Sequence, residues 1–305
     1  MVMTRRARKK KDLPDEGVGA APAAASATAA DTASGTAPAP RRATGATTTE
    51  PLATAVTAPV QPQRRAGRRL SLGTLGPVLL LRAGHPRQAV VTALGVAAAA
   101  ALAGRTTREL GLVFVTVLVG QTILGWHNDI VDAARDRRHE LAGKPVALGQ
   151  LDAGTVWFAL IVGVLLVVPL SVANGVTAGS AYLVSLVVGL LGNVALRRGL
   201  LSWLPWAVSF ALLPAFLSYG GWGGDATGNP PEIAITVLAA LLGVCVHVLR
   251  ALPGLVPDNA DGWKHLPLRL ALRTGATKLL VLGSVATAIV VAALLLTGNA
   301  VGLSQ

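Results

Sequence analysis

The sequence predicts an all-α membrane protein, a polytopic bundle of transmembrane helices, from its composition, its repeated apolar runs and the placement of its charges. Of its 305 residues, 52% are hydrophobic and only 14% are charged, and the mean hydropathy is +0.57. This is too apolar for a soluble protein of that size. The formal net charge of +12 does not indicate a nucleic-acid partner, because the basic residues gather in an N-terminal region and in inter-span loops with few aromatic residues beside them.

Residues 1–73 form the first of two predicted regions. They are rich in Ala, Thr and Pro, carry several basic clusters and lack apolar periodicity, which predicts a disordered basic tail. No apolar segment follows the first basic cluster closely enough to indicate a secretory signal peptide. Residues 74–305 form the second region, the predicted transmembrane domain.

Seven apolar runs in the second region approach the roughly 20 residues that an α-helix needs to cross a bilayer. They extend over 87–104, 110–126, 155–172, 176–196, 203–219, 233–252 and 279–297. The first run has the least defined start, because a short apolar piece at 75–81 precedes it and is separated from it by charged residues and a proline. We therefore expect about seven membrane spans.

The charges between the runs predict an orientation. Basic residues concentrate in the loops after the second, fourth and sixth runs, whereas the loops after the third and fifth runs contain no Lys or Arg. By the positive-inside bias, the N-terminus and the basic loops are expected in the cytoplasm, and only Arg105 and Arg108 oppose this orientation. The runs contain no Asp, Glu, Lys or Arg near their middles, which argues against a coupled transporter.

An acidic segment directly follows the second run. If the helix continues, Asp129, Asp132 and Asp136 lie within about 60° of one another on one face, with Asn128 beside them. Like charges at this spacing repel, and acids at a helix C-terminus oppose the helix dipole. The stripe therefore predicts a bound Mg²⁺ ion, because Mg²⁺ takes one or two protein carboxylates and completes its coordination with waters and substrate phosphates.

The acidic segment also has a simpler interpretation. It can be a solvated helix end whose acids pair with Arg135, Arg137 and Arg138, although exposed ion pairs contribute too little to explain three acids on one arc. Lys144, in the loop that follows, is a candidate phosphate partner.

A second polar segment follows the sixth run and is expected on the same face of the membrane. Asp258 is its better candidate metal ligand and Asp261 its weaker one. Two oxygen-rich segments on one side of a bundle can hold two metal ions across one diphosphate and neutralise the charge of a leaving group. His247, near the end of the sixth run, has two interpretations: a buried polar contact between helices or a direct catalytic role.

The two segments resemble the signatures of the UbiA-type membrane prenyltransferases, the family that includes 4-hydroxybenzoate polyprenyltransferase. The first resemblance is specific, and its residues are Asn128-Asp129-x-x-Asp132-x-x-x-Asp136, then Lys144-Pro145 and a glycine. The second is partial, and its residues are His247-x-x-Arg250-x-Leu252-Pro253, then Asp258, Gly262 and Leu266-Pro267-x-Arg269-Leu270. The similarity extends over about residues 80–297.

The resemblance implies a helical bundle with a lateral opening to lipid, in which Mg²⁺ and a polyprenyl diphosphate donor bind together. A prenyl group would pass to a lipophilic, aromatic acceptor in the membrane. Asp129 and Asp132 are the expected catalytic residues. The expected metal ligands are Asp129, Asp132, Asp136, Asp258 and Asp261. The expected diphosphate-binding residues are Asn128, Lys144, Arg250 and Lys264.

Three departures from the family pattern leave alternatives open. Gly254 stands where the second signature normally opens with Asp, and Arg250 stands where a related version has Asn, so that Arg250 could hold phosphate directly. The family usually has nine spans, whereas seven are predicted here. The alternatives are a terpene cyclase of the same fold and a non-catalytic or truncated family member.

Overall fold

The computed structural model describes residues 75–221 and 228–301, which all belong to the compact unit Arg65–Gln305. The predicted basic tail, residues 1–73, lies outside the described residues. The described ranges contain helices, turns and coil but no β-strand, which confirms the predicted all-α fold.

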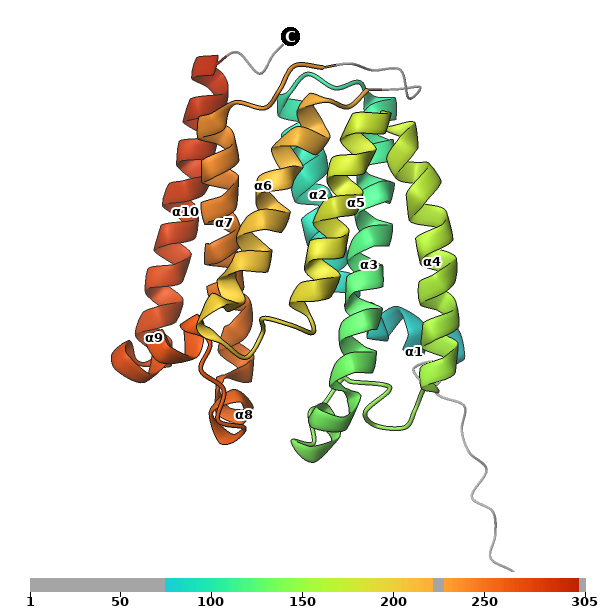
Figure 1. The fold of residues 1–305 in the computed structure, drawn as a ribbon, viewed down its shortest axis with the longest axis vertical. Coiled ribbons are helices and arrows are strands. Elements are labelled where there is room, and N and C mark those ends of the chain that lie inside the picture. Colours follow the sequence, from blue (N-terminus) through green and yellow to red (C-terminus); the bar gives the residue numbers. More distant parts are fainter. Residues whose placement is uncertain (1–74, 222–227, 302–305) are drawn as a thin grey trace, which may run out of the picture. The chain divides into compact units, whose positions relative to one another are not determined.

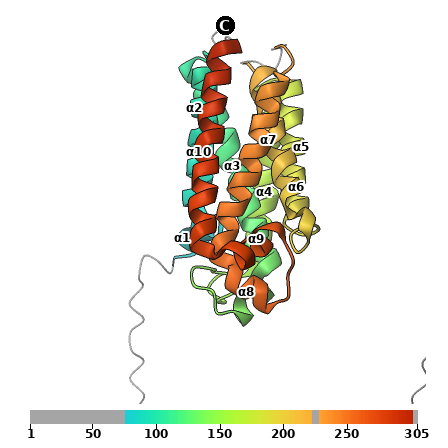
Figure 2. The ribbon, with the colours of Figure 1, turned by 90° about the vertical axis from the view of Figure 1, so that its left-hand side faces the viewer.

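Seven apolar helices form the body of the unit, and Figures 1 and 2 show them running alongside one another. They are α2 (Pro86–Leu102), α3 (Thr107–Arg138), α4 (Ala153–Ala173), α5 (Val176–Gly192), α6 (Leu204–Ser218), α7 (Ile233–Ala251) and α10 (Ala276–Val301). The shorter helical elements are α1 (Gly76–Ala83), η2 (Leu200–Trp203), η3 (Leu252–Gly254), α8 (Leu255–Ala260) and α9 (Leu266–Thr274).

Each predicted apolar run coincides with one of the seven apolar helices. Among the described residues, five helical segments are long and apolar enough to span a membrane, whereas α2 and α5 are apolar but only 17 residues long. Helix α5 ends at Gly192, earlier than the expected residue 196. There the Asn193 side chain turns to donate a hydrogen bond to the Leu124 carbonyl at 3.3 Å.

Helix α3 is the longest element, with 32 residues, and it continues without interruption through the acidic segment. Its start is defined by a capping box, in which Thr106 and Glu109 each bind the other's backbone N–H, the arrangement that satisfies free donors at a helix N-terminus. Its last turn contains Arg135, Arg137 and Arg138, whose charges favour the negative end of the helix dipole. The predicted acidic stripe therefore lies on a helix.

The apolar helices pack in chain order, from α2 on α3 through to α7 on α10. Glycines allow the close approaches: a Cβ at Gly179 would lie 2.4 Å from the Ser171 carbonyl of α4, and one at Gly243 would lie 2.4 Å from the Trp206 carbonyl of α6. Within residues 75–221 and 228–301, no comparable packing joins α2 to α10. The first and last of the apolar helices therefore do not pack closely on each other.

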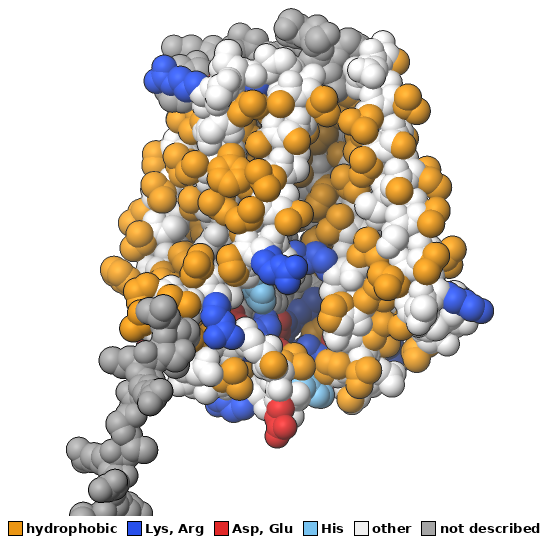
Figure 3. Space-filling view, turned by 180° about the vertical axis from the view of Figure 1, so that it is seen from behind, with side chains coloured by type: hydrophobic (Ala, Val, Ile, Leu, Met, Phe, Trp, Pro, Cys, Tyr) orange, Lys and Arg blue, Asp and Glu red, His pale blue; other side chains and the backbone are white. Residues whose placement is uncertain are grey.

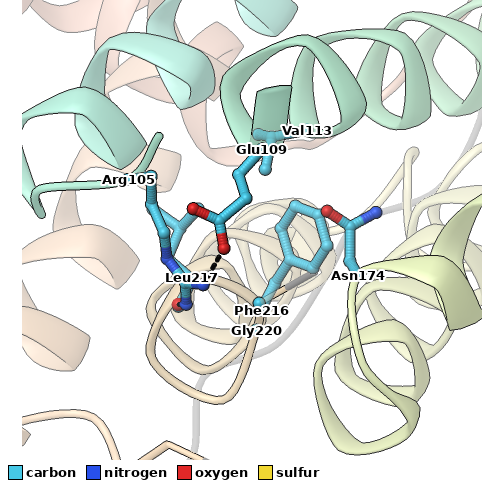
Figure 4. Close-up of a pocket in the computed structure, with 8 residues that line it drawn as sticks. Arg105, Glu109, Val113, Asn174, Phe216, Leu217 and Gly220 are labelled. Atoms are coloured by element: carbon cyan, nitrogen blue, oxygen red, sulfur yellow. Dashed lines mark hydrogen bonds and ion pairs between the residues drawn. The ribbon is translucent and has the colours of Figure 1, made fainter. Parts of the chain in front are cut away.

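The two ends of the unit differ. We call the end formed by the last turns of α3 together with α8 and α9 the polar end; it is the lower end in Figure 1. At the opposite end, Arg105 pairs with Glu109 at 3.2 Å and donates to the Leu217 carbonyl at 2.5 Å. These residues surround a pocket of only about 10 Å³, which Figure 4 shows in close-up. The Arg105 charge that opposed the predicted orientation is thus paired locally.

Candidate functional site

The acidic stripe on α3 is buried at the polar end. Asp129, Asp132 and Asp136 are 0%, 8% and 2% exposed, and all three lie on one face of the helix, as their spacing predicts. The simpler interpretation, a solvated helix end, is therefore wrong. Three buried carboxylates on one face require cations close by, because a buried charge is stable only when it is paired or binds a metal.

Two cations from segments outside α3 neutralise the stripe. Lys144 Nζ lies 3.7 Å from Asp129 Oδ1 and 3.3 Å from Asp136 Oδ2, and it donates to Asn128 Oδ1 at 3.1 Å. Arg197, which follows α5, forms an ion pair with Asp132. Spacing within the acidic segment predicts Arg135, Arg137 and Arg138 as partners. The structure instead provides Lys144 from the loop that follows α3 and Arg197 from beyond α5.

The second polar segment meets α3 through Arg135. The Arg135 guanidinium donates from Nη2 to Asp258 Oδ1 at 2.6 Å and from Nε to Asp261 Oδ2 at 2.5 Å. The Trp263 ring lies against its face, 4.2 Å from the guanidinium carbon, a favourable cation–π geometry. The two segments thus lie together at the polar end, as expected, but an arginine joins them.

Histidines complete the pairing of both acids in the second segment. Leu268 N–H donates to Nδ1 of His265 at 3.1 Å, so that Nε2 carries the proton and donates to Asp258 Oδ2 at 2.8 Å. His139 donates to Asp261 Oδ1 at 2.9 Å. The hydrogen bonds from Arg135 and His139 lower the pKa of Asp261 below its ordinary value, so that this acid is ionised near neutral pH.

A cavity of about 340 Å³ lies between the helices beside these residues. Its polar part includes Asn128, Asp132, Arg135, Arg197, Arg250 and Asp258, and its apolar part includes Val117, Leu124, Leu186, Phe210, Leu213 and Val246. The view from behind shows Lys, Arg and His side chains gathered in a hollow of the surface in the lower half of the unit (Figure 3). Three arginines and two aspartates line the cavity, so its polar part carries a net positive charge.

Arg250 has an environment unlike that of the other cavity arginines. Its guanidinium carbon lies 5.2 Å from the Trp206 ring, and among the described residues it has no carboxylate within ion-pair distance. Its side chain is exposed at the cavity wall. Arg250 is therefore the cavity cation most available to an anion.

Three histidines also line the cavity: His85, His247 and the His265 that binds Asp258. His247 Nε2 lies 3.0 Å from Ser202 Oγ, and its ring stacks on Trp206 with a centroid distance of 5.5 Å. Both interpretations of His247 thus remain, because it makes a buried helix contact and also faces the cavity. Burial, with Lys144 and Arg250 nearby, lowers the pKa of His85 to about 4, so that its ring is neutral near pH 7 and accepts from Lys144 at 3.4 Å.

Several predicted site residues are not among those that line the cavity. Asp129, Asp136 and Lys144 form the buried ion-pair cluster described above, and Asp261 contacts the cavity only through Arg135. Lys264 is exposed, and only its backbone N–H is bonded, to the Arg198 carbonyl at 2.9 Å. The geometry therefore does not place Lys264 beside the cavity.

Arg135, Arg197 and Trp206 line the cavity but are not among the site residues that the sequence predicts. Arg135 was assigned to pairing within its own helix end, and Arg197 only to the topology of the chain. The sequence does contain one indication that Arg135 and Arg197 could belong to the site, since both lie beside expected cytoplasmic helix ends. The sequence contained no signal for Trp206.

The donor sets of the two segments differ in how well they fit a divalent cation. Among the described residues, no group of three or more Asp, Glu, His or Cys side chains converges on one point. On α3, however, Asp129 Oδ1 and Asp136 Oδ2 are buried without a hydrogen bond, which is unusual for carboxylate oxygens. In the second segment, both oxygens of Asp258 and both of Asp261 already bind cationic side chains or histidine. Lys144 is the cation beside the two α3 oxygens, 3.7 Å from Asp129 Oδ1 and 3.3 Å from Asp136 Oδ2. Asp129 and Asp136 therefore fit Mg²⁺ better than Asp258 and Asp261, whose oxygens all have hydrogen-bond partners.

The fold and site define a polytopic helical membrane protein with an arginine-lined cavity between its helices. Two solved structures of a UbiA homologue from Archaeoglobus fulgidus are similar to it: one bound to GPP and Mg²⁺, at 17% identity and a TM-score of 0.55, and one bound to DMAPP and Mg²⁺, at 19% identity and a TM-score of 0.54. Each match covers 70% of this chain, and 76% and 75% of the respective homologue chains.

No protein-family model and no curated protein matches the sequence. The structural similarity shows that the chain has the fold of the UbiA homologues, which confirms at the level of the fold the resemblance predicted from the two segments. It is an integral membrane protein by its apolar helices and by this fold.

Proposed function

We propose that this chain is a prenyltransferase that binds a prenyl diphosphate in the cavity and transfers its prenyl group to a lipophilic, aromatic acceptor, with Mg²⁺ as the cofactor. The observation that carries this proposal is the division of the cavity into an arginine-lined part and an apolar part. A prenyl diphosphate has the same division, since its two phosphates are anionic and its chain is a hydrocarbon. Arginine side chains bind phosphate through charge-assisted hydrogen bonds.

The solved structures support this choice of ligand, because the A. fulgidus homologue of the same fold binds GPP or DMAPP together with Mg²⁺. In this chain, Asp132 and Asn128 at the cavity wall would hold the ion, with Asp129 and Asp136 behind them. When bound, Mg²⁺ supplies positive charge that stabilises a departing diphosphate. Lys144 holds Asp129 and Asp136 in place and acts on the diphosphate only through them.

The reaction that we propose begins when the bond between the first prenyl carbon and the diphosphate oxygen breaks, with its electron pair leaving on the diphosphate. Arg197 and Arg250 would stabilise the charge that develops on the leaving group. A carbon of the acceptor ring donates an electron pair to the allylic cation and forms the new carbon–carbon bond. The ring then loses a proton to a base in the cavity, for which His247 is the best-placed side chain.

A terpene cyclase is the alternative that the geometry also accommodates, because the same ionisation can be followed by attack from a double bond of the prenyl chain itself. The apolar wall, which includes Phe210, Leu213 and Leu186, suits either outcome. A non-catalytic family member is a further alternative that binds the diphosphate and releases it unchanged. The three possibilities differ in their products.

The proposed setting is the cell membrane, with the polar end and the N-terminus in the cytoplasm. The support for this orientation is the concentration of Lys and Arg in the loops at the polar end, several of which pair with the acids of the site. The donor would then enter from the cytoplasmic side and the acceptor from the lipid. Cysteine labelling from each side of sealed vesicles, at Gln150 and at Glu232, tests the assignment.

The test of the function uses purified protein in lipid vesicles with labelled GPP, farnesyl diphosphate or geranylgeranyl diphosphate, with and without a panel of aromatic acceptors. We expect prenylated acceptor and free diphosphate in the presence of Mg²⁺, and neither after addition of EDTA. A cyclic product formed without any acceptor would identify the cyclase. Diphosphate release that is insensitive to EDTA would contradict the proposal.

Asp132→Asn is the matching variant, and we expect it to lower turnover by about 100-fold or more, in the range seen when a preorganised charge is removed from a reacting group. Asp152→Asn is the control, because Asp152 is an exposed acid of a neighbouring loop that caps α4 by accepting from Thr155 N–H. Asparagine caps helices equally well. Thermal unfolding of both variants separates a loss of activity from a loss of folding.

A further inference from the structure

We propose that Arg135 is a direct ligand of the diphosphate and takes the role of a second metal ion, so that this site binds one divalent cation per diphosphate. This inference rests on the proposed function, and it concerns the second polar segment, where every oxygen of Asp258 and Asp261 already has a hydrogen-bond partner.

The geometry of Arg135 supports this role. Its Nε and Nη2 atoms bind Asp261 and Asp258, while among the described residues its Nη1 atom has no hydrogen-bond partner. The side chain lines the cavity. A guanidinium whose orientation is fixed on one edge can present its remaining N–H groups to phosphate without a further loss of rotamer entropy. Trp263, lying on its face, adds to that rigidity.

The charges around Arg135 also favour this role over a purely structural one. Arg197 lies at the same wall, where the Trp263 ring is 5.4 Å from its guanidinium carbon. With Arg198, whose guanidinium carbon is 5.7 Å from the same ring, three arginines lie beside Trp263. Their charges repel one another, and a ligand carrying several negative charges relieves that repulsion. The cavity wall has three arginines and two aspartates, and of these arginines only Arg135 and Arg197 form ion pairs among the described residues.

Gly254 explains why an arginine can take this place. A Cβ at Gly254 would lie 3.2 Å from Asp258 Oδ2, so a carboxylate at this position would lie beside that of Asp258. Two adjacent carboxylates suit a divalent ion, whereas glycine adds no charge beside Asp258, so that a singly charged partner balances this carboxylate. In this chain Arg135 and His265 provide that pairing.

The test counts bound metal and does not depend on turnover. Protein in detergent is titrated with Mn²⁺ in the presence of a thiodiphosphate analogue of GPP, which does not ionise, and bound Mn²⁺ is counted by electron paramagnetic resonance. We expect one Mn²⁺ per chain in the natural protein. We expect two in the double variant Arg135→Gln with Gly254→Asp, which frees Asp258 Oδ1 and adds a carboxylate beside it.

Affinity for the analogue provides the second measurement. Arg135→Gln alone is expected to weaken binding by about tenfold or more, the loss typical of a charged hydrogen bond. Arg137→Gln is the matched control, since Arg137 lies in the same helical turn but donates to the Ala147 carbonyl and is not among the residues lining the cavity. Its affinity should stay within about twofold of the natural protein.

Each outcome decides between the two proposals. Analogue bound with two Mn²⁺ ions by the natural protein, or bound equally well by Arg135→Gln, overturns the inference but leaves the proposed function intact. A natural protein that fails to bind the analogue at any Mn²⁺ concentration overturns both. Circular dichroism shows whether the Arg135→Gln variant is folded. If it is unfolded, Arg135→Lys replaces it, because lysine keeps the charge but cannot bridge two acids. The same loss of affinity is expected for Arg135→Lys.

Discussion

The two ends of the helical unit both contain arginine–carboxylate pairs, but they use them differently. At the end far from the polar end, Arg105 binds Glu109, four residues away, and the Leu217 carbonyl. The pocket around these residues is only about 10 Å³. At the polar end, Arg135 and Arg197 bind acids that are distant in sequence and face a cavity of about 340 Å³.

This difference shows that an ion pair inside a membrane protein is not by itself a sign of a binding site. The Arg105 pair ties the start of α3 to the end of α6, and its bonding groups point at each other. The pairs at the polar end leave cationic groups directed at an open volume, as with Arg250, which has no acid partner among the described residues. Substitutions at the two ends should therefore differ in what they change.

The largest difference is expected between Arg250→Gln and Arg105→Gln. Removing Arg250 takes an unpaired cation from the cavity wall, so the affinity for a prenyl thiodiphosphate should fall by about 100-fold. Removing Arg105 should leave that affinity within about twofold, because the residue lies at the other end. Isothermal titration of both variants with the analogue measures the effect, and equal losses would show that the ends do not differ in function.

A second comparison concerns the apolar part of the cavity. Leu213 lies about two helical turns along α6 from Trp206, and both line the cavity. Leu213→Trp should shorten the space for the prenyl chain, so that affinity for a geranylgeranyl analogue falls about tenfold while that for a dimethylallyl analogue is unchanged. Competition binding with analogues of increasing length measures this, and a uniform loss would mean that Leu213 does not contact the chain.

The free energy of unfolding should depend on Arg105, although the affinity for the analogue should not. Arg105→Gln removes the pair with Glu109 and the bond to Leu217, and we expect a loss of about 1–2 kcal/mol in the free energy of unfolding. Unfolding in mixed micelles, followed by circular dichroism, provides the measurement. Glu232→Gln is the control, since Glu232 caps α7 without a side-chain bond, and an equal loss in that variant would remove the structural role of Arg105.

The smallest expected effect is a pH dependence at Asp261. Since the pKa of Asp261 is lowered from its ordinary value of 3.8, its pairing with Arg135 and His139 stabilises the fold above that pH and is lost as the pH falls below it. Asp261→Asn should therefore lower the unfolding temperature at pH 7 by more than at pH 3. A difference between the two proteins that grows on acidification would contradict this assignment.

The sequence alone determined the helical class, the positions of the apolar helices and the placing of three acids on one face. These features depend on local periodicity, since apolar length predicts a span and the pitch of a helix decides which side chains share a face. The same reasoning placed Asp258 at the same end as Asp132, because loops of one charge type collect on one side of the bundle. Arg250 was found as a departure from an expected motif.

Only the tertiary structure decided how the charges at the polar end are paired. Sequence spacing assigned Arg135 to the acids of its own helix end, but it binds Asp258 and Asp261, and Arg197 binds Asp132 across 65 residues. An ion pair requires its atoms to come within a few ångströms, and that depends on which helices pack side by side and how far each extends. Helical periodicity contains no information about either, so the cavity and its cations emerge only when the chain has folded.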